Sequence, residues 1–409
     1  MDGCCINIGI TSITNRLHII LLRNWTKQAI YNYKHLLEVI KFMRKIKVLQ
    51  VFAKTGRGGA ESMVMSHLHF IDKEKFQMDF INHTQEHCDF DDEIKSLGGR
   101  IFHMPRFKIY NIVQYRNAWK TFFEEHPDYD VIHVHYFTLA PIIIPIAKEY
   151  RIKIRISHSH ITKKSNIFKR FLLNMFRKRM VEDSTLLLAC GKEAGENIFH
   201  TTNFKVFNNA IDTNRFQFSE DERIKIREEL GISQNDILIG HVGSFRSTQK
   251  NHARIIKIFK AIHEKDKRYK LVLVGNGALL PQTKQEVSNL GISNSVIFTG
   301  VRSDIPNLMS AFDVLLFPSL HEGLPVVVVE AQTSGCPVVM STNVTDEVIL
   351  TDIVTHLSLT ENNEKWGKTV ESLSKRFLNR TEYYKKVQTA GYEVRDNIKI
   401  LENIYQGNI

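Results

Sequence analysis

Apolar residues along this chain gather into short runs, and amphipathic helical patterns separate most of these runs. Ten runs have the length and apolar content of buried strands, at residues 45–53, 76–83, 99–104, 129–136, 151–160, 236–244, 269–277, 295–300, 313–319 and 337–342. Short apolar runs bounded by turn signals are typical of strands inside a parallel sheet. Strands that alternate with helices therefore predict an α/β fold in which helices cover both faces of each sheet.

The pattern restarts near the middle of the chain, which predicts two domains. The polar, turn-forming segment NNAIDTNRF (208–216) separates the two sets of strands. A chain of 409 residues is also too long for one ordinary core. We therefore expect one doubly wound domain over 45–210, a second over 211–380, and helix throughout 381–405 within the last segment, 381–409.

The first 44 residues fit neither domain. A first strand follows Met43 almost at once, so residues 1–42 are expected to be a poorly ordered extension or the result of a mis-assigned start. The alternative is a membrane-proximal helix around residues 24–44. The apolar stretch LHIILL is short and lacks a following cleavage site, so it does not predict a signal peptide. No apolar window reaches the roughly 18–20 residues of a membrane-spanning helix.

HEGLPVVVVEAQTSGCPVV (321–339) predicts a helix between two strands, although its valines favour a strand. Pro325 suits the first position of a helix, and Gly335 suits the position just after a helix. Pro337 cannot continue a helix. We therefore expect a helix over 325–334.

The turn HEGL then falls at the carboxyl end of a strand, where parallel sheets bind ligands. The N–H groups of a helix N-terminus attract phosphate, and Gly323 lets a phosphate approach the backbone. Glu322 and Glu330 flank this turn, and carboxylates accept hydrogen bonds from paired hydroxyls. A ligand with a sugar at each end of a diphosphate, a nucleotide sugar, fits this arrangement. The alternative is a helix whose glutamates are merely solvated.

SLHEGLPVVVVEAQTSGCPVV resembles the signature of the family 4 glycosyltransferases, whose two-domain architecture is called GT-B. Other stretches agree in order along the chain: GRGGAES, RISHSH, CGKEAGENIF, NNAID, HVGSFRSTQKNH and TGVRSDIPNLMSAFDVLLFPS. The resemblance covers roughly residues 46 to 405 and is nearest to the subgroup that builds bacterial capsules and exopolysaccharides. It implies two Rossmann-like domains facing across a cleft, with the final helix crossing back to the first.

The resemblance implies roles for the HEGLP segment. Glu322 would hold the donor sugar and Glu330 the nucleotide ribose. The turn residues Gly323, Leu324 and Pro325 would meet the diphosphate or the sugar.

The family also uses an Arg and a Lys after the first strand of the second domain to neutralise the leaving diphosphate, in place of a metal ion. This chain departs from the pattern, because Ser244 stands where the Arg is usual. We expect Arg246 and Lys250 to take the two roles. The alternative is that both are ordinary surface cations.

In the first domain, Gly58 and Gly59 would bring the backbone close to the donor phosphates or the acceptor. As a dinucleotide fingerprint this turn is weak, because Glu61 stands where the third glycine should be.

The family carries a histidine after a first-domain strand, near the reacting sugar. His158 is the predicted residue in RISHSH, and His160 is the alternative. His133 and His135 are expected to be structural.

Two Asp-x-Asp triplets could suggest a metal site. DFD (89–91) is expected to start a helix and DYD (128–130) to lead into a strand. Because the resemblance is to a metal-independent family, it implies no metal and no cofactor other than a nucleotide-sugar co-substrate. UDP is the expected carrier of the sugar.

The net charge of +11 is concentrated in one part of the chain. Residues 151–180 hold ten Lys or Arg and no acid, and 165–180 has the pattern of a basic amphipathic helix. An anionic membrane surface is the expected partner. Nucleic acid and a helix that simply packs on its own domain are the alternatives. The five scattered cysteines indicate a reducing compartment.

Together these features predict a retaining, metal-independent glycosyltransferase. It would act by front-face attack on a nucleotide-sugar donor, with a lipid-linked glycan as acceptor, and would bind no nucleic acid. It would be cytoplasmic and peripheral on the inner face of the cell membrane. The alternatives are a sugar-nucleotide epimerase or phosphorylase of similar architecture, and a nucleotide-sugar-binding partner subunit without activity.

Overall fold

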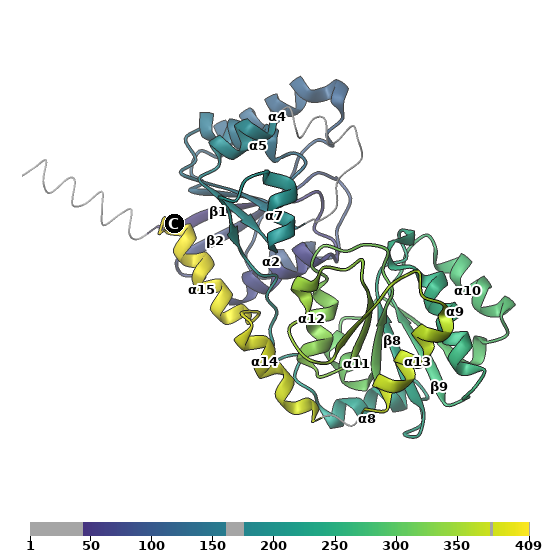
Figure 1. Cartoon of the computed structure of the whole chain (residues 1–409). Coiled ribbons are helices and arrows are strands. Elements are labelled where there is room, and N and C mark those ends of the chain that lie inside the picture. The colour runs from purple at the N-terminus through teal and green to yellow at the C-terminus, as the bar shows by residue number, and fades with distance from the viewer. Residues whose placement is uncertain (1–43, 161–175, 377–378, 409) are drawn as a thin grey trace, which may run out of the picture. The chain divides into compact units, whose positions relative to one another are not determined.

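A computed structural model describes residues 44–160, 176–376 and 379–408 (Figure 1). The predictions for the first 44 residues and for most of the basic helix 165–180 therefore lie outside the described residues, apart from 176–180. Two parallel sheets, one in each half of the chain, organise the rest.

The first sheet has seven strands in the order β3-β2-β1-β4-β5-β6-β7, and every pair is parallel. The strands are β1 (Ile46–Val51), β2 (Phe76–Asn82), β3 (Ile101–His103), β4 (Val131–Val134), β5 (Ile154–Ser159), β6 (Leu186–Ala189) and β7 (Lys205–Val206). β1 pairs with β4 with Val48 opposite Val131. The order reverses between β1 and β4, which is where doubly wound sheets bind ligands.

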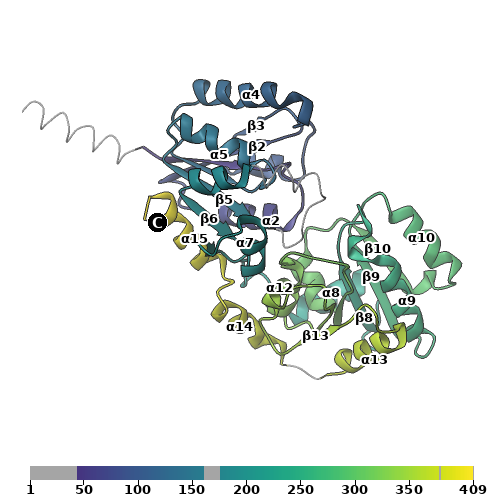
Figure 2. The same cartoon turned by 45° about the horizontal axis from the view of Figure 1, so that its top comes forward.

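The two faces of the first sheet differ in chemistry because side chains alternate along each strand. Leu49, Val51 and Ile132 belong to an apolar core with Tyr115 and Trp119 of α4. Figures 1 and 2 both show α4 (Ile112–Glu125) and α5 (Ala140–Glu149) over this face. The opposite face carries histidines and a glutamine, and it meets α2 (Gly59–Phe70) and α15 (Val394–Tyr405).

The second sheet has six parallel strands in the order β10-β9-β8-β11-β12-β13. They are β8 (Ile237–Val242), β9 (Tyr269–Val274), β10 (Val296–Gly300), β11 (Val314–Phe317), β12 (Val338–Ser341) and β13 (Val354–Leu357). Counted within the sheet this is the 3-2-1-4-5-6 order of the nucleotide-binding doubly wound fold. Its reversal lies between β8 and β11.

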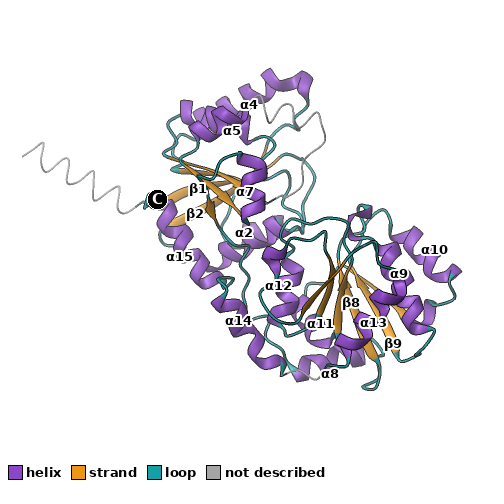
Figure 3. Cartoon of the chain, in the orientation of Figure 1, coloured by secondary structure: helices purple, strands orange, loops and turns teal. Residues whose placement is uncertain are grey.

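Helices cover both faces of the second sheet (Figure 3). The helices are α8 (Glu220–Glu229), α9 (His252–His263), α10 (Leu280–Asn289), α11 (Ile305–Ala311), α12 (Val326–Thr333), α13 (Asn363–Ser374) and α14 (Tyr383–Thr389). On one face Phe259 of α9, Val287 of α10 and Trp366 of α13 close a core against β8, β9 and β11. The remaining described helices are α3 (Asp91–Ser96) and α7 (Lys192–Phe199), with 3₁₀ turns that include η1 (Ile109–Asn111), η2 (Thr248–Lys250) and η5 (Arg380–Glu382).

All ten predicted strands are present, and three further strands were missed. β6 and β13 have four residues each and β7 has two. The prediction of helix throughout 381–405 was wrong. The helix breaks between α14 and α15, where Gly391 adopts φ +83° and Ile211 forms a β-bridge with Glu393.

Candidate functional site

The reversal point of the second sheet brings two predicted residues together. Lys250 ends the turn that follows β8, and Glu322 lies in the turn that follows β11. Lys250 Nζ lies 2.8 Å from Glu322 Oε1, and the Gln249 amide donates to Glu322 Oε2 at 3.2 Å. The Glu322 side chain is only 9% exposed, so the carboxylate is held by its partners rather than by water.

Backbone and amide contacts fix the two turns against each other. Asn251 Nδ2 donates to the Pro318 carbonyl at 3.0 Å, and the Leu320 N–H donates to the Gln249 carbonyl at 2.9 Å. The Lys250 ammonium also lies 4.8 Å from the centre of the Phe317 ring. Lys250 is therefore held between Glu322 and Phe317, and its role at the diphosphate stays a prediction.

Glu330 lies on α12 and is partly exposed. No residue in the described ranges donates a hydrogen bond to its carboxylate. Burial raises its pKa to about 7, and the charge of Arg215 opposes this rise. A desolvated carboxylate without a partner is suited to accept hydrogen bonds from a ligand.

α12 begins one residue later than expected. Pro325 is the cap, with an extended backbone (φ −73°, ψ 109°), and the helix runs from Val326 to Thr333. The first turn of this helix follows Gly323 and Leu324 directly, and a helix N-terminus attracts phosphate, so phosphate binding at this turn stays a prediction. Gly335 has φ +60°, as a residue just past a helix end should.

Arg246 lies on the turn after β8 with a side chain that is 55% exposed. Phe245 before it is fully buried and stacks on His252 at 3.8 Å between ring centres. This anchor leaves Ser244 and Arg246 both exposed. The assignment of the usual arginine's role to Arg246 stays a prediction.

In the first sheet, Gly58 caps α2 and Gly59 is its first residue. A Cβ at Gly58 would lie 2.3 Å from the carboxylate of Glu61, so a side chain there would displace that group. Burial raises the pKa of Glu61 to about 7. Glu61 is thus a desolvated carboxyl group beside the turn. In the sequence it was noted only because it stands where the third glycine of a dinucleotide fingerprint would be.

The predicted histidine lies in a group of four. His133 and His135 come from the end of β4, and His158 and His160 from the end of β5, with neighbouring ring centres 4.0 to 5.2 Å apart. Burial lowers the pKa of all four rings, so they are neutral. Gln50 and Tyr405 bond to this group, and nothing in the sequence linked them to it.

The two candidate histidines differ in access. His158 is fully buried, whereas His160 is partly exposed just beyond β5. A free ring nitrogen is enclosed in both residues, Nε2 in His158 and Nδ1 in His160, so which of the two contacts a ligand stays a prediction. His133 and His135 are buried within the network, as expected of structural residues.

The Asp-x-Asp triplets have structural partners. Asp91, the first residue of α3, accepts from Thr55 Oγ1 at 2.6 Å and from the Cys88 N–H at 2.9 Å. Asp130 accepts from the Lys47 N–H at 3.1 Å just before β4. Within the described residues, the group with metal-ligand geometry is instead His133, His135 and His158, whose nitrogens lie within 4.8 Å of one another.

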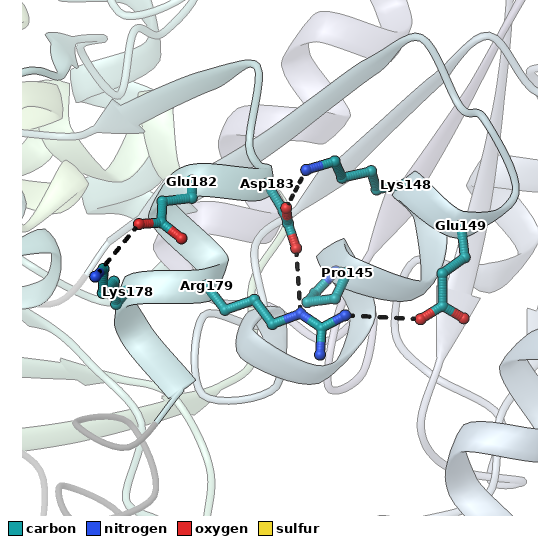
Figure 4. Close-up of a pocket in the computed structure, with 7 residues that line it drawn as sticks. All are labelled: Pro145, Lys148, Glu149, Lys178, Arg179, Glu182 and Asp183. Atoms are coloured by element: carbon teal, nitrogen blue, oxygen red, sulfur yellow. Dashed lines mark hydrogen bonds and ion pairs between the residues drawn. The ribbon is translucent and has the colours of Figure 1, made fainter.

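The described end of the basic segment lines a surface pocket with α5 (Figure 4). Its charged residues pair with one another: Lys148 with Asp183, Arg179 with Asp183 and Glu149, and Lys178 with Glu182. These cations are therefore partly neutralised. None of the helices in the described parts of the chain has the length and apolar character needed to cross a membrane.

Comparison with protein families gives two matches that together cover most of the chain. A family described as "Glycosyltransferase Family 4" matches residues 57–215, and one described as "Glycosyl transferases group 1" matches residues 222–398.

Among curated proteins, the chain is similar to the putative glycosyltransferase EpsF of Bacillus subtilis (strain 168). The two are 33% identical over 369 residues, which cover 88% of this chain and 96% of EpsF. It is also similar to the capsular polysaccharide biosynthesis glycosyltransferase CapH of Staphylococcus aureus, with 24% identity over 317 residues, 73% of this chain and 82% of CapH.

Among solved structures, HepE from Anabaena in complex with UDP and glucose has a TM-score of 0.74. The identity is 18%, and the match covers 88% of this chain and 100% of that one. At this identity the likeness bears on the fold alone. With the two doubly wound sheets, it confirms the GT-B fold that the resemblance implied.

Proposed function

Because the chain belongs to glycosyltransferase family 4, in its capsule and exopolysaccharide subgroup, we propose that it transfers one sugar from a nucleotide-sugar donor to a lipid-linked glycan and retains the anomeric configuration. The observation that carries this proposal is the Lys250–Glu322 pair at the reversal point of the second sheet, with Glu330 on the adjoining helix. UDP is the proposed carrier, since HepE was solved with UDP and glucose.

The proposed roles follow from the chemistry of each group. Glu330, a carboxylate without a partner among the described residues, accepts from both ribose hydroxyls. The diphosphate lies at the start of α12, where the N–H groups of the first turn attract phosphate. Lys250, with Arg246, stabilises the negative charge that develops as the sugar leaves. These cations stabilise the charge on the diphosphate that a metal ion stabilises in other sugar transferases.

Retention is proposed to occur by front-face attack. Glu322 is already bonded to Lys250 and Gln249, so it positions the sugar rather than attacking the anomeric carbon. The acceptor hydroxyl attacks that carbon as the bond to the diphosphate breaks, and its proton passes to the leaving phosphate oxygen. The protein contributes positioning and electrostatic stabilisation.

Thermal stabilisation by a panel of UDP-, GDP- and dTDP-sugars, measured in EDTA, tests donor binding. One nucleotide sugar should raise the melting temperature of the wild type, and Glu330→Ala should weaken this effect, because one acceptor for the ribose is lost. Selective stabilisation would identify the donor and show that binding needs no metal. If no nucleotide sugar raises the melting temperature of the wild type, the site is not assembled as proposed. The alternative of a partner subunit without activity then gains support.

An exposed apolar cluster beside exposed cations favours docking on an anionic lipid surface at the inner face of the membrane. Ile109, Tyr110 and Val113, from η1 and the start of α4, are 50%, 81% and 68% exposed. Arg106 and Lys108 next to them are also exposed, and Lys108 lies over the Tyr110 ring. Aromatic and apolar groups that enter the headgroup region, with cations beside them, bind such membranes.

Vesicle sedimentation with and without phosphatidylglycerol tests this surface. The double variant Tyr110→Ser/Val113→Ser should bind anionic vesicles about tenfold less tightly, because less apolar area enters the bilayer. Val206→Ser/Val301→Ser removes two exposed valines elsewhere and is the matched control. Equal binding of both variants, or binding of the wild type that ignores lipid charge, would contradict membrane docking through this cluster.

A further inference from the structure

We propose that Asn251 and Ser341 are positioning residues for the donor sugar, because their side chains hold the main chain that leads to Glu322. Neither side chain is assigned a contact with the sugar. Each donates a hydrogen bond to a backbone carbonyl of the segment 318–320, and Glu322 follows two residues later. These hydrogen bonds belong to the free protein. Only their use in holding a sugar rests on the function proposed above.

The segment 318–320 leaves the second sheet where β11 ends, at Phe317. Beyond the end of a strand, backbone carbonyls no longer have the ladder that satisfied them and need donors from elsewhere. All three carbonyls of this segment accept a hydrogen bond from a side chain on a neighbouring turn. The pairs are Asn251 Nδ2 with Pro318 at 3.0 Å, Ser341 Oγ with Ser319 at 2.5 Å, and Asn343 Nδ2 with Leu320 at 2.9 Å.

The donors approach the segment from both sides. Asn251 lies on the turn after β8, whereas Ser341 ends β12 and Asn343 follows it, and β8 and β12 are the two neighbours of β11. The segment therefore cannot pivot toward either neighbour without breaking a bond. Ser341 is fully buried, so water does not replace its hydroxyl. Asn343 is exposed, so water can replace its amide, and we expect it to contribute less.

The turn after β8 holds the Glu322 segment in two ways. Gln249 and Lys250 donate to the carboxylate of Glu322, and the next residue, Asn251, donates to the main chain at residue 318. The Leu320 N–H donates in return to the Gln249 carbonyl at 2.9 Å. Three consecutive residues thus fix both the side chain and the main chain of one short segment. This coincidence favours a positioning role over simple satisfaction of the carbonyls at a strand end.

The backbone of Asn251 indicates that its amide is the feature that matters. Asn251 adopts the left-handed conformation, with φ +58° and ψ +46°, between η2 and α9. Glycine adopts this conformation most readily, because it has no Cβ. The Asn251 side chain does not cap α9 but donates to the Pro318 carbonyl. Replacement by glycine therefore removes the amide without straining the backbone.

The nucleotide is assigned to a different part of the site. The diphosphate and the ribose are proposed to lie at α12, which begins at Val326, beyond the segment 318–320. Val328 and Val329 anchor this helix in the core, and both are fully buried. Loosening the segment should therefore displace the sugar contact of Glu322 and leave the contacts with UDP in place. This difference separates positioning of the sugar from a general loss of stability.

Amide hydrogen exchange in the free protein tests the hydrogen bonds themselves. The Leu320 N–H is protected in the wild type by its bond to the Gln249 carbonyl. Asn251→Gly and Ser341→Ala should each speed its exchange about three- to tenfold, the size of one hydrogen bond. Arg151→Gly is the matched control, because Arg151 is also left-handed, with φ +59°, and has an exposed side chain in the first domain. It should leave the exchange of Leu320 unchanged.

Calorimetric titration tests the use of these bonds. The probes are UDP, UDP-glucose, UDP-galactose and UDP-N-acetylglucosamine. For the UDP-sugar that the wild type selects, the ratio of its Kd to the Kd of UDP should rise about three- to tenfold in Asn251→Gly and in Ser341→Ala. The Kd of UDP itself should stay within about twofold of the wild type, since the contacts at α12 are kept. A loss of stability alone would lower the melting temperature and leave the ratio unchanged.

Three results would overturn the inference: wild-type exchange of Leu320 in Asn251→Gly, faster exchange with an unchanged Kd ratio, or the same effects in Arg151→Gly. If Ser341→Ala does not fold, Asn251→Gly decides, because glycine accepts the same backbone conformation. Failure of the proposed function would instead appear as a wild type that binds none of the four nucleotides. The role in holding a sugar would then fall with it, whereas the exchange rates would still decide whether the two side chains hold the segment.

Discussion

Lys250→Ala should lower kcat by about 10²- to 10³-fold and leave nucleotide binding within about tenfold of the wild type. Lys250 Nζ is held at 2.8 Å from Glu322 in a site that excludes most water. The ammonium therefore needs little reorganisation to stabilise the charge on the departing diphosphate. Steady-state transfer assays and calorimetric titration with UDP would separate these two effects.

Removing Lys250 also leaves Glu322 without its cation, so a fold defect must be distinguished from a chemical one. Lys250→Met/Glu322→Gln is a neutral pair of similar shape, and it should melt near the wild type but remain inactive. Lys257→Ala, an exposed lysine on α9, should be fully active. A Lys250→Ala protein with at least a tenth of wild-type kcat would contradict the assigned role.

The second large effect concerns Glu330. With a pKa of about 7, its carboxylate is mostly protonated at pH 6 and mostly ionised at pH 8. Only the ionised form accepts from both ribose hydroxyls, so the affinity for the nucleotide sugar should rise about tenfold between these pH values. Glu330→Gln should bind weakly and show no such dependence. Titrations at the two pH values check this, and an unchanged pH profile in Glu330→Gln would refute it.

The free energy of unfolding should fall as the pH rises, whereas the affinity for the nucleotide sugar should increase. The pKa of Glu330 is higher in the folded state than in the unfolded state, so the folded state holds a proton that the unfolded state releases above about pH 4.5. Its contribution to stability is thus present below that pH and is lost as the pH rises through 7. Glu330→Gln removes the titrating group, and it should stabilise the protein by about 1–3 kcal/mol at pH 8 but little at pH 4.5. Chemical denaturation at both values would measure this.

Much of the fold was predictable because the hydrophobic core dictates the sequence pattern. Each long strand lies inside a parallel sheet, so its apolar run is continuous and easily recognised. The order of the strands was not predictable, since it depends on which strands pair. The break at Gly391 was missed because it is stabilised by the distant Ile211, which pairs with Glu393.

For the candidate site, individual residues could be predicted from the sequence, but the contacts between them could not. Glu322 and Lys250 belong to separate motifs, and the family resemblance implied a role for each without showing that they form an ion pair. The choice between His158 and His160 stays a prediction, because a motif does not reveal how each ring is enclosed and both rings have a buried nitrogen. Gln50 and Tyr405 are 355 positions apart, and a bond between such distant residues leaves no local pattern.

The contact between Gln50 and Tyr405 also sets an order of events during synthesis. Both sheets, from β1 to β13, emerge from the ribosome before Tyr405 is translated. Until then the first domain holds four histidines on a face that α15 has not yet covered. That face would be wet and its rings free to exchange protons with solvent. A nascent chain with complete sheets would thus lack the hydrogen bonds that Gln50 and His133 make to Tyr405, which form only when the last helix docks.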